Sequence, residues 1–155
     1  MDEAEIRRQV GMIAEGLQAK DPESLKKLYA PDVVSFDIEP PLQSVGVEAK
    51  LKNWTPVFAF FESVTYEVRE LTLTVGDDMA FGHAFARLSG TLKDGTAMGG
   101  MWVRVTYCFR KIDDTWLITH DHVSVPLDIA SGKGTVDLKP WQITGVRATP
   151  GNCPR

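Results

Sequence analysis

The stretch Trp116–Pro126, WLITHDHVSVP, is the most informative part of the chain for the fold, and it contains two of the three histidines. Its polar and apolar residues alternate as in a half-buried strand, in which every second side chain points to the same face. By this period one face carries Trp116, Ile118, His120, His122 and Ser124. The stretch therefore predicts a rigid strand that presents a row of ionisable groups, with Asp121 on the opposite face.

Helical segments precede the strands, and this order indicates the fold class. Apolar residues at helical spacing predict helices over 2–19, 22–28 and 47–61, the third with a kink at Pro56. Alternating segments predict a short strand at 33–37 and long strands at 64–75, 79–91, 98–111 and 115–125. We therefore predict an α+β fold: a cone-shaped, curved antiparallel sheet wrapped around three N-terminal helices, with a cavity at its open end.

The first long strand has an irregular apolar pattern. Its apolar residues change from Tyr66 and Val68 to Leu71, Leu73 and Val75. An odd step in a pattern of period two moves the following side chains to the other face of the strand. A bulge near Arg69 or Glu70 accounts for this change.

Length, charge and hydropathy restrict the class of protein. The 155 residues suit one domain with its own core, and the net charge is -4. Lysines and arginines are scattered along the chain, which argues against nucleic acid or a membrane surface as the main partner. The longest apolar run, Val57–Phe61, is far shorter than the roughly 20 residues of a membrane helix. Because Met1-Asp2-Glu3 lacks the basic start of a secretory signal, we expect a cytoplasmic protein.

A change in composition near residue 128 predicts a domain boundary. We expect a folded domain over 1–128 and an irregular C-terminal extension over 129–155, which is rich in Gly and Pro. Apolar residues in the extension indicate that it docks on a surface: Leu138, Trp141, Ile143 and Val146. Cys108 and Cys153 are predicted to be unpaired thiols, as is usual in the cytoplasm.

The segment order and the motif Trp116-x-x-x-His120-x-His122-x-Ser124 resemble the nuclear transport factor 2-like superfamily. Similar strands close the sheet in SnoaL-like proteins and in the association domain of calcium/calmodulin-dependent kinase. The resemblance covers roughly residues 2–128. It implies a pocket for a small organic molecule or anion, no cofactor, and a homodimer that forms through the sheet.

A second motif, Leu28–Asp37 followed by Gly46, resembles the part of ketosteroid isomerase that carries the general base. The resemblance implies that Asp37 points into the cavity and takes a proton from a small carbonyl compound. Ala14 and Thr106 stand where the resemblance expects a tyrosine and a second acid. Loss of an oxyanion donor typically lowers the rate about a hundredfold, so steroid isomerisation by that mechanism is not expected. An alternative is that Asp37 is a solvated or paired acid at a strand end.

The same resemblance assigns other residues to the cavity. If Thr106 takes the place of the second acid, its strand faces the cavity with Trp102, Arg104, Thr106 and Cys108. Arg104 then pairs with Asp37 or with an anionic ligand. Trp54 stands at the position of a pocket tyrosine, and with Phe58 it forms an apolar wall, although both residues also suit the core.

The histidines leave two interpretations open. His120 and His122 act as acid and base partners in the cavity, or they are packed histidines whose polar atoms bond to neighbours. The length of the hairpin before this strand decides whether they lie on the same face as the residues of the neighbouring strand that are assigned to the cavity. A metal site is not predicted, because Asp121 falls on the opposite face of the strand. The remaining candidate binding residues are Ser124, His83 and Arg87, the last two either in the pocket or at a dimer contact.

Two functions are consistent with these residues. The first is a cofactor-independent isomerase, cyclase or lyase that uses Asp37 as a general base on a small carbonyl compound. In this mechanism His120 or His122 is the partner acid and Arg104 stabilises negative charge. The second is a non-catalytic ligand-binding or oligomerisation module of the same fold. The superfamily fold alone does not choose between them.

Overall fold

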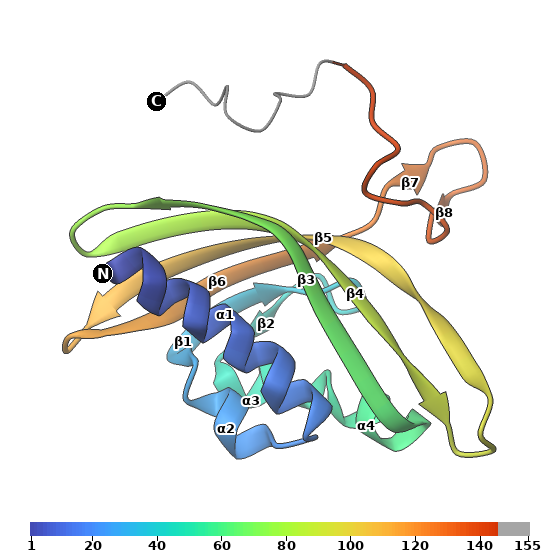
Figure 1. Cartoon of the computed structure of the whole chain (residues 1–155), viewed down its shortest axis with the longest axis horizontal. Helices are drawn as coiled ribbons and strands as arrows, with labels where there is room; N and C mark the ends of the chain where they lie inside the picture. The colour runs from blue at the N-terminus through green and yellow to red at the C-terminus, as the bar shows by residue number, and fades with distance from the viewer. Residues whose placement is uncertain (146–155) are drawn as a thin grey trace.

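A long curved sheet covers the helices, which lie on its concave side (Figure 1). The computed structural model describes residues 1–145. The helices are α1 (Asp2–Gln18), α2 (Pro22–Lys26), α3 (Val47–Lys52) and α4 (Thr55–Phe60). The main sheet contains β1 (Tyr29–Phe36), β2 (Ser44–Val45), β3 (Phe61–Val75), β4 (Met79–Leu92), β5 (Ala97–Ile112) and β6 (Thr115–Ser124). The predicted α+β class is confirmed.

The strand order of the main sheet is β2-β1-β6-β5-β4-β3. Strands β3 to β6 form an antiparallel meander, as predicted. Strand β1 adds one parallel pairing to this antiparallel meander, since it runs parallel to β6. Parallel neighbours need a long crossover, and here helices α3 and α4 and four other strands lie between β1 and β6 in the chain. This pairing brings Ser35 on β1 opposite Asp121 on β6.

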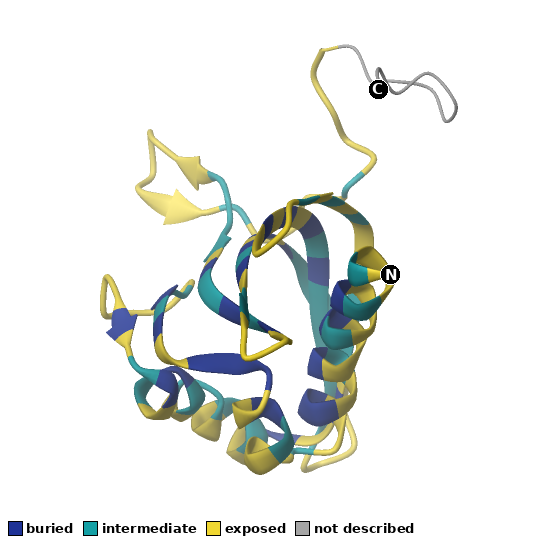
Figure 2. Ribbon diagram, turned by 90° about the vertical axis from the view of Figure 1, so that its left-hand side faces the viewer, coloured by how far each residue is buried: buried dark blue, intermediate teal, exposed yellow. Residues whose placement is uncertain are grey.

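Helix α1 supplies one side of the core. Its apolar residues recur every three or four positions and are buried: Ile6, Val10, Ile13 and Leu17. Figure 2 shows the buried residues on the surfaces where the sheet and the helices face each other. Helix α2 begins as predicted at Asp21, whose side chain accepts a hydrogen bond from the backbone N–H of Ser24.

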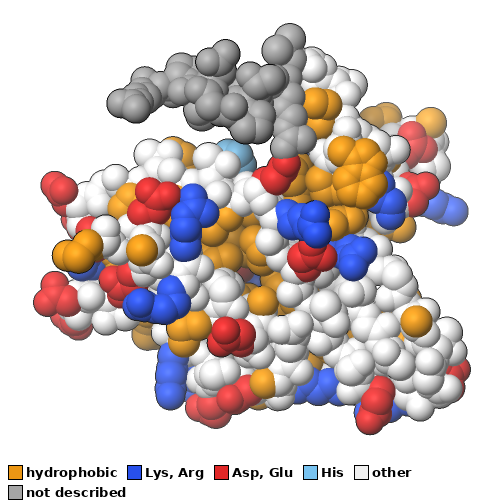
Figure 3. Space-filling model, in the orientation of Figure 1, with side chains coloured by type: hydrophobic (Ala, Val, Ile, Leu, Met, Phe, Trp, Pro, Cys, Tyr) orange, Lys and Arg blue, Asp and Glu red, His pale blue; other side chains and the backbone are white. Residues whose placement is uncertain are grey.

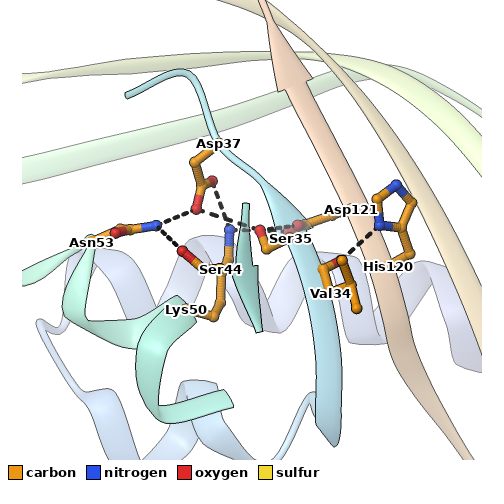
Figure 4. Close-up of polar contacts among 8 residues, drawn as sticks. All are labelled: Val34, Ser35, Asp37, Ser44, Lys50, Asn53, His120 and Asp121. Carbon is orange, nitrogen blue, oxygen red and sulfur yellow. Dashed lines mark hydrogen bonds and ion pairs between the residues drawn. The ribbon is translucent and has the colours of Figure 1, made fainter. Parts of the chain in front are cut away.

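The predicted third helix is interrupted. It forms two short helices, α3 and α4, with the break at Asn53 and Trp54 rather than a kink within one helix. Pro56 explains the break, because a proline ring clashes with the carbonyl four residues earlier, and that residue is Lys52, the last of α3. Asn53 lies at this break, and its side chain points toward Asp37, the residue after β1 (Figure 4).

A bulge in β3 lies where the sequence predicts it. The register against β4 shifts between Arg69 and Thr72, and Glu70 has a positive φ of 57°. Tyr66 and Val68 before the bulge, and Leu71 and Leu73 after it, therefore all pack against the core.

A second bulge, in β6, is not predicted. Phe109 pairs with Ile118 and Cys108 pairs with His120, so Thr119 is an extra residue in the ladder. An extra residue reverses the faces of every later side chain. The prediction of one continuous face from Trp116 to Ser124 is therefore wrong. Trp116 and Ile118 face the core, and beyond the bulge Asp121 does so, with only 2% of its surface exposed.

Residues after Ser124 form a small second sheet. Strands β7 (Leu127–Asp128) and β8 (Lys133–Gly134) pair as a hairpin that crosses the predicted boundary at residue 128. Cys108 is a free thiol, as predicted, whereas Val146 and Cys153 lie outside the described residues. Among residues 1–145 no helix has the length and apolar character needed to cross a membrane. Positive and negative side chains are interspersed on the face seen in Figure 3.

Candidate functional site

The side chain of Lys50 lies between two carboxylates inside the cone (Figure 4). Its Nζ atom is 2.8 Å from Oδ1 of Asp37 and 3.0 Å from Oδ2 of Asp121. The Lys50 side chain is only 2% exposed. A buried ammonium is stable only when paired and hydrogen-bonded, so these contacts make a coupled group rather than two independent ion pairs.

Three separate parts of the chain bring this cluster together. Asp37 follows the last residue of β1. Gly46, at φ +91°, donates its N–H to the carbonyl of Val33 at 2.7 Å and thereby fixes the start of α3 against β1. Lys50 then points inward from the last turn of α3, three residues after the buried Val47. The bulge in β6 turns Asp121 toward the same place.

Neutral side chains complete the hydrogen bonding of the cluster. The hydroxyl of Ser35 contacts both carboxylates and lies closest to Asp121, and its single proton serves one of them at a time. The amide of Asn53 donates to Oδ2 of Asp37 and lies 3.4 Å from the hydroxyl of Ser44. Asp37 therefore accepts from Lys50, Asn53 and at most Ser35. A carboxylate has about four acceptor positions, so at least one remains on Asp37 for a ligand.

The cluster carries more negative than positive charge. Burial alone lowers the pKa of Lys50, but Asp121 and Asp37 outweigh it and the net pKa is raised, so the ammonium stays charged. One ammonium between two carboxylates leaves a net charge of about -1. The Asp37 side chain is 15% exposed and that of Asp121 only 3%, so Asp37 is the carboxylate that a ligand can reach.

A cavity of about 130 Å³ adjoins Asp37. Its polar lining residues are Asp37, Glu39, Asn53 and Tyr66. Its apolar lining residues are Ile38, Trp54, Val57, Leu88, Met101, Val103 and Val123. The predicted position of Trp54 in the wall of the cavity is thus the observed one, and Phe58 stacks on Trp54 with ring centroids 6.3 Å apart. A cavity of roughly 150 Å³ can hold one benzene ring, so this one fits a compound with about one small ring.

Tyrosine side chains surround the inner end of the cluster. Burial raises the pKa of Tyr66 to about 12 and the pKa values of Tyr29 and Tyr107 well above 10. Tyr66 is therefore a neutral phenol at physiological pH and can donate a hydrogen bond. The hydroxyl of Tyr107 lies near Tyr66 but makes no hydrogen bond of normal geometry within residues 1–145.

We expect the free energy of unfolding to fall as the pH rises from 10 to 12. The folded protein keeps the Tyr66 proton up to a pKa of about 12, whereas the unfolded chain loses it near 10. The stabilisation is complete below pH 10 and is lost as the pH approaches 12. Replacement Tyr66→Phe should make the decline shallower by up to about 1 kcal/mol per pH unit. Urea denaturation at pH 9, 10 and 11 measures this, and equal slopes in both proteins would contradict it.

Arg104, Thr106 and Cys108 do not face the cavity. The predicted facing of β5 is wrong, since the buried residues of that strand are Val103, Val105, Tyr107 and Phe109. The prediction assumed that Thr106 takes the place of the second acid of ketosteroid isomerase, whereas Thr106 is exposed on the outer face. Arg104 lies exposed on the outer face, where its Nε donates to the hydroxyl of Ser124 at 3.1 Å. It therefore cannot pair with Asp37, which lies inside the cone.

The other predicted side chains of the outer face also lie away from the cavity. His83 is exposed and pairs across strands with Thr106, which pairs in turn with His122. Arg87 lies over the ring of Trp102, with its Cζ atom 5.6 Å from the ring centroid. These five residues form one outer surface of the sheet, so the structure places His83 and Arg87 outside the pocket.

His120 is held by the backbone of its parallel neighbour. Its Nδ1 atom lies 2.6 Å from the carbonyl oxygen of Val34, so Nδ1–H is the donor (Figure 4). Its ring also meets the ring of Phe36 edge to face, and His122 contacts Phe36 in the same way. For His120 the geometry favours the packed interpretation, whereas His122 is exposed. Among residues 1–145 no group of three or more His, Cys, Asp or Glu side chains is arranged to hold a metal ion.

Sequence reasoning missed Lys50, Asn53, Tyr66 and the inward direction of Asp121. Lys50 stands three residues after the apolar Val47 and next to Leu51, which marks it as close to the buried side of α3. That signal was available in the sequence. The direction of Asp121 was not, because it depends on the unpredicted bulge at Thr119.

The curved sheet over N-terminal helices is the architecture of the nuclear transport factor 2-like superfamily, and the predicted resemblance is confirmed. The chain belongs to the SnoaL-like domain family, whose model matches residues 6–128. No curated protein matches the chain.

Solved structures agree with this assignment. An NTF2-like protein of unknown function from Pseudomonas putida has 26% identity and a TM-score of 0.80, over 90% of this chain and 96% of the other. A proposed calcium/calmodulin-dependent kinase II association domain from Xanthomonas campestris has 21% identity and a TM-score of 0.69, over 81% and 88%. A proposed scytalone dehydratase from Novosphingobium aromaticivorans has 15% identity and a TM-score of 0.71, over 79% and 83%. The latter two similarities establish the fold alone.

Proposed function

We propose that the protein binds a small, uncharged carbonyl compound in the 130 Å³ cavity and moves a proton on it, with Asp37 as the general base. One observation carries this proposal: Asp37 is the carboxylate that both lines the cavity and is held in place by Lys50 and Asn53. A base must be positioned within hydrogen-bond reach of the proton that it takes, and these contacts fix its position.

The charges near the cavity support an uncharged ligand over an anion. Asp37 and Glu39 both line the cavity, while the ammonium of Lys50 is already shared by two carboxylates. The cation that the sequence analysis assigned to the pocket, Arg104, lies on the outer face. An anionic ligand would meet a net negative lining, which costs binding energy.

The proposed step is a proton transfer that conserves atoms and charge. Asp37 takes a proton from the carbon next to the carbonyl, and the electrons of the broken C–H bond move to the carbonyl oxygen. Tyr66, which lines the same cavity as a neutral phenol, donates a hydrogen bond to that oxygen. Return of the proton to the same carbon gives exchange, and its return to another carbon gives isomerisation.

Exchange of α-protons in deuterium oxide tests this function without knowledge of the natural substrate. We expect the protein to accelerate exchange on cyclohexanone, which fits the cavity, and much less on cyclohexanone-4-carboxylate, which carries a negative charge. Proton NMR of the ligand measures both rates. Binding of cyclohexanone without any accelerated exchange would contradict the catalytic proposal and favour a ligand-binding module of the same fold.

The predicted homodimer through the sheet remains a proposal. The outer face of the sheet carries exposed apolar side chains, among them Met79 and Phe81, which are 58% and 53% exposed. Such side chains on an open sheet face suit contact with a second copy. This assembly is compatible with either function, because the cavity opens on the inner side of the sheet.

A further inference from the structure

A larger groove lies next to the cavity. It has a volume of about 950 Å³ and lies between the β1–β2 loop and the chain from His122 to Leu127. The groove and the cavity are separate spaces that share four lining residues: Asp37, Ile38, Glu39 and Val123. The two spaces therefore meet at the carboxylate that we propose as the base.

The lining of the groove is mainly apolar. Its apolar residues away from the cavity include Pro40, Pro41, Leu42, Val125 and Leu127. Leu42 is 96% exposed and Leu127 is 57% exposed, so their side chains are free to contact a ligand. Apolar surface of this kind gains about 25 cal/mol per Å² when it is removed from water.

One wall of the groove comes from the β7–β8 hairpin. Leu127 pairs with Gly134, and the N–H of Thr135 donates to the carbonyl of Pro126 at 2.7 Å. A Cβ atom on Gly134 would lie 3.0 Å from Cγ2 of Val125, so the hairpin packs closely against the end of β6. Gly134 lies beyond residues 6–128, the part that matches the family model, whereas Leu127 lies within it.

We propose that the groove binds an apolar tail of the same compound whose carbonyl head enters the cavity. This inference rests on the proposed function. The cavity holds about one ring, and the groove has room for several more carbons. The substrate class is thus an uncharged carbonyl compound with a compact head and an alkyl or aryl tail. Glu39 and Asp37 at the junction disfavour a tail that begins with an anionic group.

A series of 4-alkylcyclohexanones, from ethyl to hexyl, tests the tail site by isothermal titration calorimetry. Each methylene that is buried contributes about 0.8 kcal/mol, so Kd should fall about threefold to fourfold per added carbon until the groove is full. In Leu127→Asn the ratio of Kd between the ethyl and hexyl compounds should shrink at least several-fold. Met12→Asn is the matched control, because Met12 is 41% exposed and lies on α1 outside the groove, and it should keep the wild-type ratio.

The results separate this inference from the proposed function. Affinity that is independent of chain length, or that depends on it equally in wild type and Leu127→Asn, would overturn the tail site even if cyclohexanone undergoes exchange. Chain-length-dependent binding without proton exchange would support the tail site and reject the catalytic step. A second variant, Leu42→Asn, guards against local misfolding of the hairpin, since Leu42 lines the groove from the opposite loop.

Discussion

Replacement of Lys50 by methionine is expected to lower the free energy of unfolding by about 3–5 kcal/mol. Methionine has nearly the length of lysine, so the change removes the charge with little change in packing. Asp37 and Asp121 would then lie close together inside the cone without the ammonium that both contact at 3.0 Å or less. Two unpaired carboxylates in a buried place repel each other and lose their hydration.

Chemical denaturation monitored by tryptophan fluorescence measures this loss. Lys52→Met is the matched control, because Lys52 lies on the same helix and is exposed, and it should change stability by less than about 0.5 kcal/mol. The deficit of Lys50→Met should shrink at acid pH, since protonation of either carboxyl group removes the repulsion. A loss below about 1 kcal/mol at neutral pH would show that the carboxylates do not depend on Lys50.

Replacement of Asp37 by asparagine is expected to reduce proton exchange on cyclohexanone by a factor of about 10²–10⁴. Asparagine has the same shape, and its carbonyl oxygen can still accept from Lys50 at the position of Oδ1. It cannot take a proton from carbon at neutral pH. Loss of activity with retained binding of cyclohexanone would therefore identify the missing base rather than a damaged cavity.

Asp32→Asn controls for the loss of one carboxylate from the same part of the chain. Asp32 lies on β1, is exposed, and does not line the cavity next to Asp37. It should leave the exchange rate within about twofold of wild type. If Asp37→Asn retains the full rate, Asp37 is not the base and the proposed mechanism is wrong.

Several features of the site could be predicted because they depend on local spacing. The pattern around residues 33–42 predicted that Asp37 lies at the end of a strand and before a loop, and β1 ends one residue earlier, at Phe36. The position of Trp54 in the cavity wall was implied by the resemblance to ketosteroid isomerase, in which Trp54 takes the place of a pocket tyrosine. The bulge near Glu70 was visible because apolar residues lie on both sides of it and reveal the change of face.

The partners of Asp37 could not be predicted in the same way. Asp121 lies 84 positions further along the chain, and only the parallel pairing of β1 with β6 brings it near. Arg104 was expected in the cavity because Thr106 on the same strand was taken to stand in the place of the second acid of ketosteroid isomerase, and the facing of His122 depended on the hairpin before β6. The outer face of the sheet takes both side chains instead.

Period and composition alone established the helices, the strands and the α+β class, because an amphipathic period records which side of each element avoids water. The facing of the last strand was decided only in the folded sheet. The alternation of polar and apolar residues does not reveal the bulge at Thr119. Because Thr119 is an extra residue in the ladder, the two histidines after it point outward and Asp121 points inward. Such an insertion is set by pairing with strands distant in the chain, and a local pattern contains no information about that pairing.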